Sequence, residues 1–488
     1  MDVSAYSLFC QRLFRQNEFA IKLGLEAMGA ALQSLSPALQ SAPHVLIAGT
    51  NGKGQCGATL SSIATFAGHR CGLYTSPHLL SFRERIRIDG LPVSEEALLP
   101  IGCSILQRFG GLPLPTRLEA YLDPCLCGPG PSQGLTYFEL ATLMAVSVFA
   151  RLECSFAVYE VGLGGRLDAT NALDPALSII TAIGLDHEQW LGRSLEEIAS
   201  EKAGIMRPER PVVIGSRTAV DTLLAKAEAL QAPAYLIGRD FGLEARDQAY
   251  VFWGLGREET FTLSQNLYPF QRDNVATAVC AALLLEEMGR FSTRAFADVV
   301  AALESTRWPG RMWSVAPELV AQRLPLVPHL ILDAGHNPQG AEHCCAAIAH
   351  LQSQDPRPLG LVANACGDKD IAEIARHYAR LPDLQATVAA PVENARVLNA
   401  EDFCRAAGWP THCAHATLPE AITALSRELG PNARVLITGS IYLLGEAMAW
   451  LGCSDPLRST TLVRAPHDVA QPDELGTEGL ANDFPRHA

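Results

Sequence analysis

Apolar runs alternate with helical patterns in the first part of the chain. Each of four short runs predicts a buried strand: HVLIA (44–48), CGLYT (71–75), FAVYEV (156–161) and LSIITAI (177–183). A helix is expected over residues 137–150, and another begins at Ser194, which has Glu197 at the spacing of a capping box. The alternation predicts a mainly parallel sheet with helices on both faces.

A second α/β pattern follows Pro309. Strands are expected at HLILDA (329–334), LGLVAN (359–364), a weaker run near 386–390, and RVLITGS (434–440). The predicted fold class is therefore α/β. It combines a mainly parallel, doubly wound N-terminal domain of P-loop-like type with a smaller, Rossmann-like α/β C-terminal domain. The expected domain ranges are 1–312 and 313–453.

Two stretches interrupt these patterns. Residues 109–134 are rich in Gly and Pro, which predicts a surface loop or lid. Residues 454–488 contain four prolines and no sustained periodicity. We expect these last residues to form a disordered tail.

Charge and composition exclude several classes of partner. The chain has 38 Lys+Arg against 52 Asp+Glu, a net charge of −14, so we expect neither a nucleic-acid nor an anionic-membrane partner. The apolar stretch 140–150 is far shorter than the roughly 20 residues that cross a bilayer. The N-terminus lacks the pattern of an export signal, which predicts a cytoplasmic protein. The 14 cysteines of the chain are scattered and do not have the spacing of a zinc site, so we expect most of them in the core.

The strongest local signal is the Gly-rich segment GTNGKG (49–54), which follows a predicted strand and precedes a helical run. Such a turn exposes backbone N–H groups at a helix N-terminus, and Lys53 can reach the outer phosphates of a nucleotide. The segment departs from the regular P-loop, because Ile47 replaces the first Gly and Gly54-Gln55 follow the Lys. A Gly-rich turn with a solvated Lys is the alternative interpretation.

Three candidate metal ligands follow predicted strands: Ser76, Glu160 and the pair Asp186-His187. Magnesium prefers hard oxygen ligands, and ligands gather at the carboxyl ends of parallel strands. Taken singly, each has an ordinary explanation, as a turn residue, a strand-end cap and a packed histidine. Their joint placement around one Gly-rich turn favours a metal site.

Two further turns carry polar residues. VGLGGRLDATN (161–171) follows the strand of Glu160, and its adjacent glycines allow a ligand to approach the backbone closely. LDAGHNP (332–338) places Asp333 and His336 between a strand and a helix, with Pro338 suited to the first helical turn. A loop without ligand and a simple helix cap are the alternatives.

The motifs together resemble the bifunctional dihydrofolate synthase/folylpolyglutamate synthase family, a branch of the Mur ligase superfamily. The resemblance rests on their order and spacing from about Ile21 to Trp450: GTNGKG, YTSPHL (74–79), LTYFE (135–139), EVGLGGRLDATN (160–171), LDHEQWLG (185–192), EKAGI (201–205), QRDNVATA around Asn274, RWPGR (307–311), DAGHNP and ITGSIYL (437–443). It implies that residues 1–312 bind ATP and that residues 313–453 form a glutamate ligase domain.

The resemblance also implies a role for each matching position. It implies ATP contacts at Thr50, Asn51, Gly52, Lys53, Asn274, Arg311 and Asp333. It implies ligands of two magnesium ions at Ser76, Glu160, His187 and Lys202, with Lys202 carbamylated by CO₂. It implies a dihydropteroate pocket formed by Leu23, Thr136, Phe138, Asp168 and Ala169. Lys53, Lys202 and His336 are the catalytic residues that it implies. From its neighbours alone, Lys202 is expected to be a solvated helical lysine beside Glu201.

The implied activity is that of a monomeric, ATP- and Mg²⁺-dependent acid–amino-acid ligase with small-molecule substrates: L-glutamate, dihydropteroate and tetrahydrofolates. Polyglutamylation alone, a peptidoglycan-type ligase and a non-catalytic nucleotide sensor are the alternatives. The peptidoglycan-type ligase needs a UDP-binding domain, and only 48 residues precede Gly49.

Three departures from the family pattern stand out. Gln55 replaces the usual Ser or Thr, and Gly335 replaces the usual Ala, which is expected to loosen the start of a helix. The segment 362–370 lacks the usual Gly-Met-Leu. The resemblance implies that this segment lines the site of the incoming glutamate, so the departure concerns the specificity for glutamate.

Overall fold

The computed structural model describes residues 4–16, 24–35, 42–128, 134–290, 296–315, 320 and 329–453. Contacts divide the chain into two units, Met1–His78 with Phe82–Trp308, and Leu79–Ser81 with Pro309–Ala488. The division after Trp308 lies close to the boundary expected after residue 312, and the domain assignment itself stays a prediction. Leu23 and the expected disordered tail, 454–488, lie outside the described residues.

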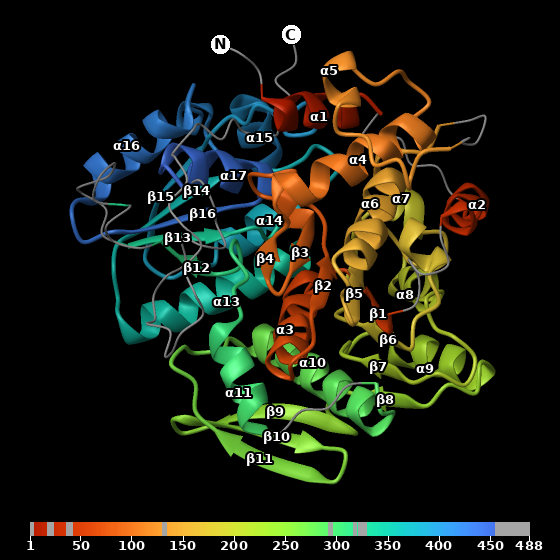
Figure 1. Cartoon of the computed structure of the whole chain (residues 1–488). Coiled ribbons are helices and arrows are strands. Elements are labelled where there is room, and N and C mark those ends of the chain that lie inside the picture. Colours follow the sequence, from red (N-terminus) through yellow and green to blue (C-terminus); the bar gives the residue numbers. More distant parts are fainter. Residues whose placement is uncertain are drawn as a thin grey trace. The chain divides into compact units, whose positions relative to one another are not determined.

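An eight-stranded sheet lies at the centre of the first unit, as far as the structure describes it (Figure 1). The strand order is β4-β3-β2-β5-β1-β6-β7-β8. The strands are β1 (His44–Ala48), β2 (Cys71–Tyr74), β3 (Ile86–Ile88), β4 (Leu91–Pro92), β5 (Phe156–Glu160), β6 (Leu177–Ile180), β7 (Val212–Ile214) and β8 (Ala234–Leu236). Neighbouring strands pair in parallel except at one edge, where β2–β3 and β3–β4 pair antiparallel. The mainly parallel sheet and its four predicted strands are confirmed, whereas β3, β4, β7 and β8 were not predicted.

Helices cover both faces of this sheet. Along β1, Leu46 and Ala48 join one hydrophobic cluster, while Val45 and Ile47 join the other, because successive side chains point to opposite faces. The first cluster includes residues of α1 (Ala5–Phe14), α2 (Glu26–Ser34), α4 (Glu95–Phe109), α6 (Tyr137–Arg151), α8 (Leu195–Ala203) and α9 (Val220–Ala229). The second includes residues of α3 (Lys53–Phe66), α10 (Pro269–Glu287) and α11 (Phe296–Ser305). Burial on both sides explains why the central strands are continuously apolar.

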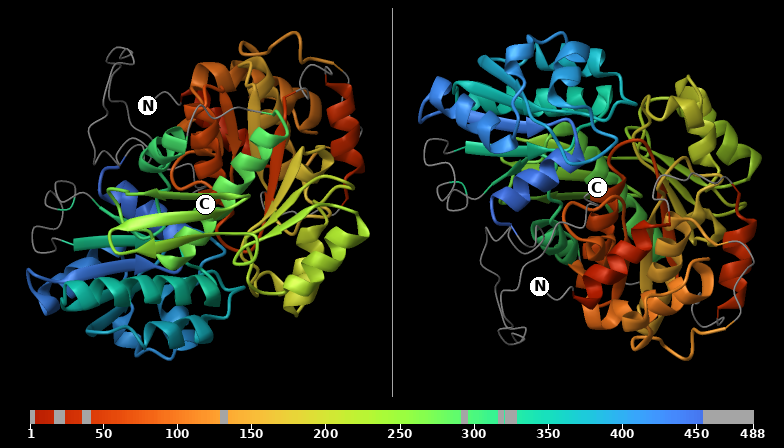
Figure 2. Two further views of the ribbon diagram at one scale, coloured as in Figure 1. Left: turned by 90° about the horizontal axis from the view of Figure 1, so that it is seen from below. Right: turned by 90° about the horizontal axis from the view of Figure 1, so that it is seen from above.

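A small antiparallel sheet was not predicted. It consists of β9 (Phe241–Arg246), β10 (Ala249–Gly254) and β11 (Arg257–Phe261), in the order β11-β10-β9, and the left view of Figure 2 shows its yellow-green strands. Its Phe241, Phe252 and Phe261 join the cluster formed by α10 and α11. The strands β10 and β11 are joined by a two-residue turn at Leu255 and Gly256, with φ of 53° and 70°.

The capping box at Ser194 and Glu197 is confirmed at the start of α8. The described part of 109–134 lies mostly at the surface, as predicted, with Leu112 46% and Tyr121 37% exposed, whereas its short helix was not predicted and its role as a lid stays a prediction. There, α5 (Thr116–Glu119) buries Leu118, and Leu114 is buried nearby. Arg12 of α1 donates hydrogen bonds to the backbone carbonyls of residues 112 and 113. Apolar residues spaced within the Gly- and Pro-rich stretch therefore anchor it to the core.

The second unit contains a five-stranded sheet in its described residues, in the order β12-β13-β16-β14-β15. The strands are β12 (Trp313–Ser314), β13 (His329–Asp333), β14 (Leu359–Ala363), β15 (Leu384–Ala389) and β16 (Arg434–Thr438). The helices are α13 (Pro338–Gln354), α14 (Ile371–Tyr378), α15 (Ala400–Ala407), α16 (Leu418–Leu429) and α17 (Ile441–Trp450). Leu330 and Leu332 pack with α16 and α17, and Ile331 is buried on the opposite face. The predicted α/β pattern is confirmed here.

None of the helices in the described residues combines the length and apolar character needed to cross a membrane.

Candidate active site

The Gly-rich turn between β1 and α3 has a backbone that only glycine adopts readily. Gly49 has φ of 152° and Gly52 has φ of 88°. A Cβ at Gly49 would lie 1.9 Å from Oγ1 of Thr181, and a Cβ at Gly52 would lie 2.2 Å from Oδ1 of Asn274. Both glycines are therefore required by backbone conformation and by the close approach of a side chain.

This turn is anchored on the segment that follows β6. The Thr50 hydroxyl donates to the carbonyl of Gly184 (3.0 Å) and accepts from its N–H (3.1 Å). The N–H groups of Thr50 and Asn51 both donate to the carbonyl of Ala182. The expectation of successive exposed N–H groups is thus corrected for these two residues. In the first turn of α3, the N–H groups of residues 53–55 have no acceptor within the helix, which makes them suitable for a phosphate.

Three of the predicted residues meet at the carboxyl ends of β2 and β5. Lys53 Nζ lies 3.9 Å from Glu160 Oε1, and the N–H of Ser76 donates to Glu160 Oε2 (3.1 Å). Glu160 is only 4% exposed. A carboxylate, a hydroxyl-bearing residue and an ammonium group are therefore gathered beside the Gly-rich turn. Carboxylate and hydroxyl oxygens are the hard ligands that fit a divalent cation such as Mg²⁺.

Lys202, in the last turn of α8, belongs to the same cluster. Its Nζ donates to the carbonyl of Gly49 (2.9 Å), and the residue is 5% exposed. Burial, and secondarily the charge of Lys53, lowers the pKa of Lys202 to about 7, while Asp186 and Asp168 oppose this shift. The interpretation of Lys202 as a solvated helical lysine is therefore wrong. The preceding Glu201 instead forms the exposed ion pair, with Arg166 (2.9 Å).

His187 lies at the start of α7 (Glu188–Leu191) in a left-handed conformation, with φ of 52°. Its N–H donates to Oδ1 of Asp186 (2.8 Å), and its Nε2 lies 3.9 Å from the same oxygen. Asp186 interacts electrostatically with Lys202. The segment that anchors the Gly-rich turn thus continues into His187 and Asp186.

The residues predicted to bind dihydropteroate have local structural partners. Thr136 caps α6 in a capping box with Glu139. The Phe138 ring packs 5.9 Å from that of Tyr74. The buried Asp168 carboxylate accepts four hydrogen bonds: from the N–H groups of Gly162, Leu163 and Thr170 and from the Thr170 hydroxyl. Burial raises the pKa of Asp168, and these bonds oppose the shift. Asp168 therefore organises the loop 162–171, whose Ala169 begins η3 (Ala169–Ala172).

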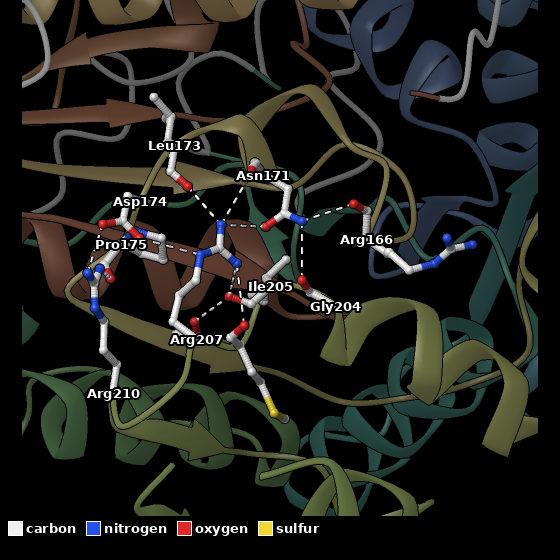
Figure 3. Close-up of polar contacts among 11 residues, drawn as sticks. Arg166, Asn171, Leu173, Asp174, Pro175, Gly204, Ile205, Arg207 and Arg210 are labelled. Carbon is white, nitrogen blue, oxygen red and sulfur yellow. Dashed lines mark hydrogen bonds and ion pairs between the residues drawn. The ribbon is translucent and has the colours of Figure 1, made fainter. Parts of the chain in front are cut away.

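Sequence reasoning missed Arg207, which joins this loop to the end of α8 (Figure 3). Its Nη2 donates to the carbonyls of Asn171 (3.0 Å) and Leu173 (2.8 Å) and to Asn171 Oδ1 (3.0 Å). Its Nη1 donates to the carbonyl of Ile205 (2.9 Å). Asn171 Nδ2 donates to the carbonyl of Gly204 (3.2 Å). Most of these acceptors are backbone carbonyls, which no sequence motif reveals.

In the second unit, the Asp333 carboxylate accepts from the N–H groups of Met312 (2.9 Å) and Gly335 (2.7 Å). Arg311 Nη1 lies 4.0 Å from Asp333 Oδ1. Burial raises the pKa of Asp333, against the charge of Arg311. His336 Nδ1 lies 2.9 Å from the carbonyl of Ala334, and because a carbonyl only accepts, Nδ1 carries the hydrogen.

The turn at Gly335 is tight, which corrects the expectation of a loosened helix start. A Cβ there would lie 2.8 Å from the carbonyl oxygen of Gly340 and 2.9 Å from Asp333 Oδ1. The Asn337 side chain caps α13 by accepting from the N–H of Gly340 (2.8 Å). Gly335 thus permits the close approach of two backbone segments.

Comparisons with known proteins agree with this architecture. Residues 318–441 match the family model "Mur ligase, glutamate ligase domain". The chain is 32% identical over 431 residues to the dihydrofolate synthase/folylpolyglutamate synthase of Escherichia coli (strain K12), covering 88% of this chain and 91% of that protein. It is similar in structure to E. coli FolC in complex with DHPP and ADP, with a TM-score of 0.74, 29% identity and coverage of 92% and 98%. A bifunctional folylpolyglutamate synthase/dihydrofolate synthase with Mn, AMPPNP and L-glutamate bound gives a TM-score of 0.74, 28% identity and coverage of 92% and 100%.

A parallel sheet with a Gly-rich turn at a helix N-terminus, followed by a unit that matches the glutamate ligase model, defines a Mur ligase, a class of ATP-dependent ligases. Within that class, the family is identified by the sequence identity of 32% to the Escherichia coli protein, over 88% of this chain and 91% of that protein. The chain belongs to the dihydrofolate synthase/folylpolyglutamate synthase family, and the sequence-based resemblance is confirmed.

The contacts of Arg207 predict a large effect on stability. Arg207→Ala removes the donor to the carbonyls of Asn171 and Leu173, whereas the Ile205 carbonyl keeps the Ser178 hydroxyl. We expect the substitution to lower the free energy of unfolding by about 2–3 kcal/mol in urea titrations. Arg210→Ala is the matched control, because Arg210 forms an ion pair with the exposed Asp174 (2.7 Å) and should cost less than about 1 kcal/mol. Equal losses in the two variants would contradict the role assigned to Arg207.

The tight turn at Gly335 predicts whether an alanine at this position raises or lowers the stability. Gly335→Ala should lower the thermal unfolding midpoint, because the added methyl group meets the Gly340 backbone and overpacking costs about 1–3 kcal/mol. If Gly335 only loosened the helix start, the same substitution would raise the midpoint. Differential scanning calorimetry distinguishes the two outcomes.

Proposed function

We propose that this chain is an ATP-dependent ligase that adds L-glutamate to dihydropteroate, forming dihydrofolate, and to reduced folates, forming folylpolyglutamates. The observation that carries the proposal is the cluster of Lys53, Glu160, Ser76 and Lys202 beside the Gly-rich turn. The relatives named above support it, since one is described with DHPP and ADP and another with Mn, AMPPNP and L-glutamate.

The chemistry explains why such a cluster is needed. A carboxylate is a poor acyl donor, so the pterin substrate's carboxylate attacks the γ-phosphate of ATP to give an acyl phosphate and ADP. The amine of L-glutamate then displaces phosphate and forms the amide. Both reactants in the first step are anions, so Lys53 and the N–H groups at the start of α3 are placed to stabilise charge on the transferring phosphoryl group.

For the metal, we assign Mg²⁺ to Ser76, Glu160, His187 and Lys202, with two ions bound. When bound, the ions neutralise charge on the phosphates. We also assign a carbamate to Lys202, because a buried amine that accepts CO₂ loses a proton and becomes an oxygen ligand. The lowered pKa of Lys202, about 7, supports this assignment, since only the neutral amine reacts with CO₂.

The remaining assignments rest on the resemblance. We assign Asn274, Thr50, Asn51 and Gly52 to the nucleotide in the first unit. In the second unit, Arg311 and Asp333 are assigned to the nucleotide and His336 to the phosphoryl group. The dihydropteroate pocket is assigned to Leu23, Thr136, Phe138, Asp168 and Ala169. We further propose that the protein is cytoplasmic and monomeric. Sedimentation analysis of the purified chain tests whether it is a monomer.

The acceptor range is tested by phosphate release. With ATP, Mg²⁺ and L-glutamate, we expect release with dihydropteroate and also with tetrahydrofolate. We expect no release when L-glutamate is omitted, because phosphate leaves only when the amine displaces it. Release with tetrahydrofolate alone would leave a folylpolyglutamate synthase and overturn the bifunctional assignment. No release with either acceptor would favour a non-catalytic nucleotide-binding protein.

The metal assignment is tested at Glu160. Glu160→Gln keeps the size of the side chain but removes its charge, so we expect kcat to fall by about a hundredfold or more, as for other losses of transition-state charge stabilisation. Glu244→Gln, at an exposed glutamate on β9, is the control and should retain full activity. An unchanged kcat in Glu160→Gln would overturn the metal-site assignment.

A further inference from the structure

Gln55 is the departure from the family pattern that the proposed function leaves unexplained. It is the third residue of α3 and stands where the resemblance places a Ser or Thr. The residue is 9% exposed, so its amide is largely removed from water. A buried amide needs hydrogen-bond partners, because leaving it unpaired is costly.

The partner of Gln55 is distant in sequence. Asn274 Nδ2, on α10, donates to Gln55 Oε1 at 2.9 Å, across a separation of 219 residues. The two helices pack in one hydrophobic cluster, which brings these positions together. A Ser or Thr hydroxyl is carried on a side chain two bonds shorter than that of Gln, so the longer amide suits this bridge between the helices.

Asn274 is held from a second side by the Gly-rich turn. It is 7% exposed. Its Oδ1 approaches Gly52 so closely that a Cβ added there would lie only 2.2 Å from this oxygen. The side chain is therefore confined between Gly52 and Gln55. Because Nδ2 is committed to Gln55, the orientation of the Asn274 amide is fixed before any ligand binds.

We propose that Gln55 is a positioning residue that orients Asn274 for the nucleotide, and that it does not act as a metal ligand. The inference rests on the proposed function, in which Asn274 contacts the nucleotide. Preorganisation of Asn274 lowers the cost of ordering this side chain on binding, so Gln55 contributes to nucleotide affinity. The metal-ligating groups lie elsewhere, around Glu160, which Ser76 and Lys53 contact directly.

The test measures ADP affinity by calorimetry and, separately, KM for ATP and the half-saturating Mg²⁺ concentration. Gln55→Met removes the amide at similar volume, and we expect it to weaken ADP binding and raise KM for ATP by about three- to tenfold, the loss of one hydrogen bond. The half-saturating Mg²⁺ concentration at saturating ATP should not change.

A double-mutant cycle tests whether Gln55 acts through Asn274. In an Asn274→Ala background, Gln55→Met should cause no further loss of ADP affinity, because the bridged amide is already absent. Gln271→Met is the matched control on α10: Gln271 Oε1 accepts from the N–H of Tyr268 (3.1 Å) and caps the helix, so its loss should leave ADP affinity unchanged.

The outcomes separate this proposal from the proposed function. If Gln55→Met binds ADP as tightly as the unaltered chain, if its effect adds fully to that of Asn274→Ala, or if it raises the Mg²⁺ requirement, the positioning role is wrong. If the unaltered chain binds no ADP, the proposed function itself fails. Thermal unfolding of each variant identifies any loss that arises from misfolding.

Discussion

The site depends on the hydrogen bonds that fasten the Gly-rich turn to the segment after β6. Thr50 exchanges two hydrogen bonds with Gly184, and Ala182 accepts from the backbone of the turn. These bonds fix where α3 begins, and they place Asp186 and His187 on the same segment. A change in the anchoring segment would therefore displace the phosphate-binding turn and the candidate metal ligand together.

Burial gives the cluster its electrostatic character. The charge of Lys53 helps to lower the pKa of Lys202, and both ammonium groups donate to the carbonyl of Gly49. While Lys202 carries its proton, the two cations at this turn repel each other unless an anion or a carboxylate lies between them. Glu160 supplies one negative charge, and a polyphosphate would supply more. The arrangement therefore favours an anionic ligand over an empty turn.

The sequence predicts the parts of the fold that depend on local pattern. The strands at 44–48 and 156–160 and the cap at Ser194 were predicted because apolar runs and capping spacing are read within a few residues. The β9–β11 sheet was missed because its strands mix charged and apolar residues. The contact of Gln55 with Asn274 and the carbonyl contacts of Arg207 join residues far apart in the chain, so no local pattern contains them. The roles given to the site residues come from the resemblance and stay predictions.

The small antiparallel sheet also bears on self-association. In the described residues, β11 is one of its two outer strands, and an outer strand offers unpaired backbone groups to any strand of another molecule. Its first three residues, Arg257, Glu258 and Glu259, are all charged. Bringing such a strand against a second copy would desolvate these charges and place like charges close together. The charged side chains of β11 thus disfavour edge-to-edge pairing of this strand with a strand of another molecule.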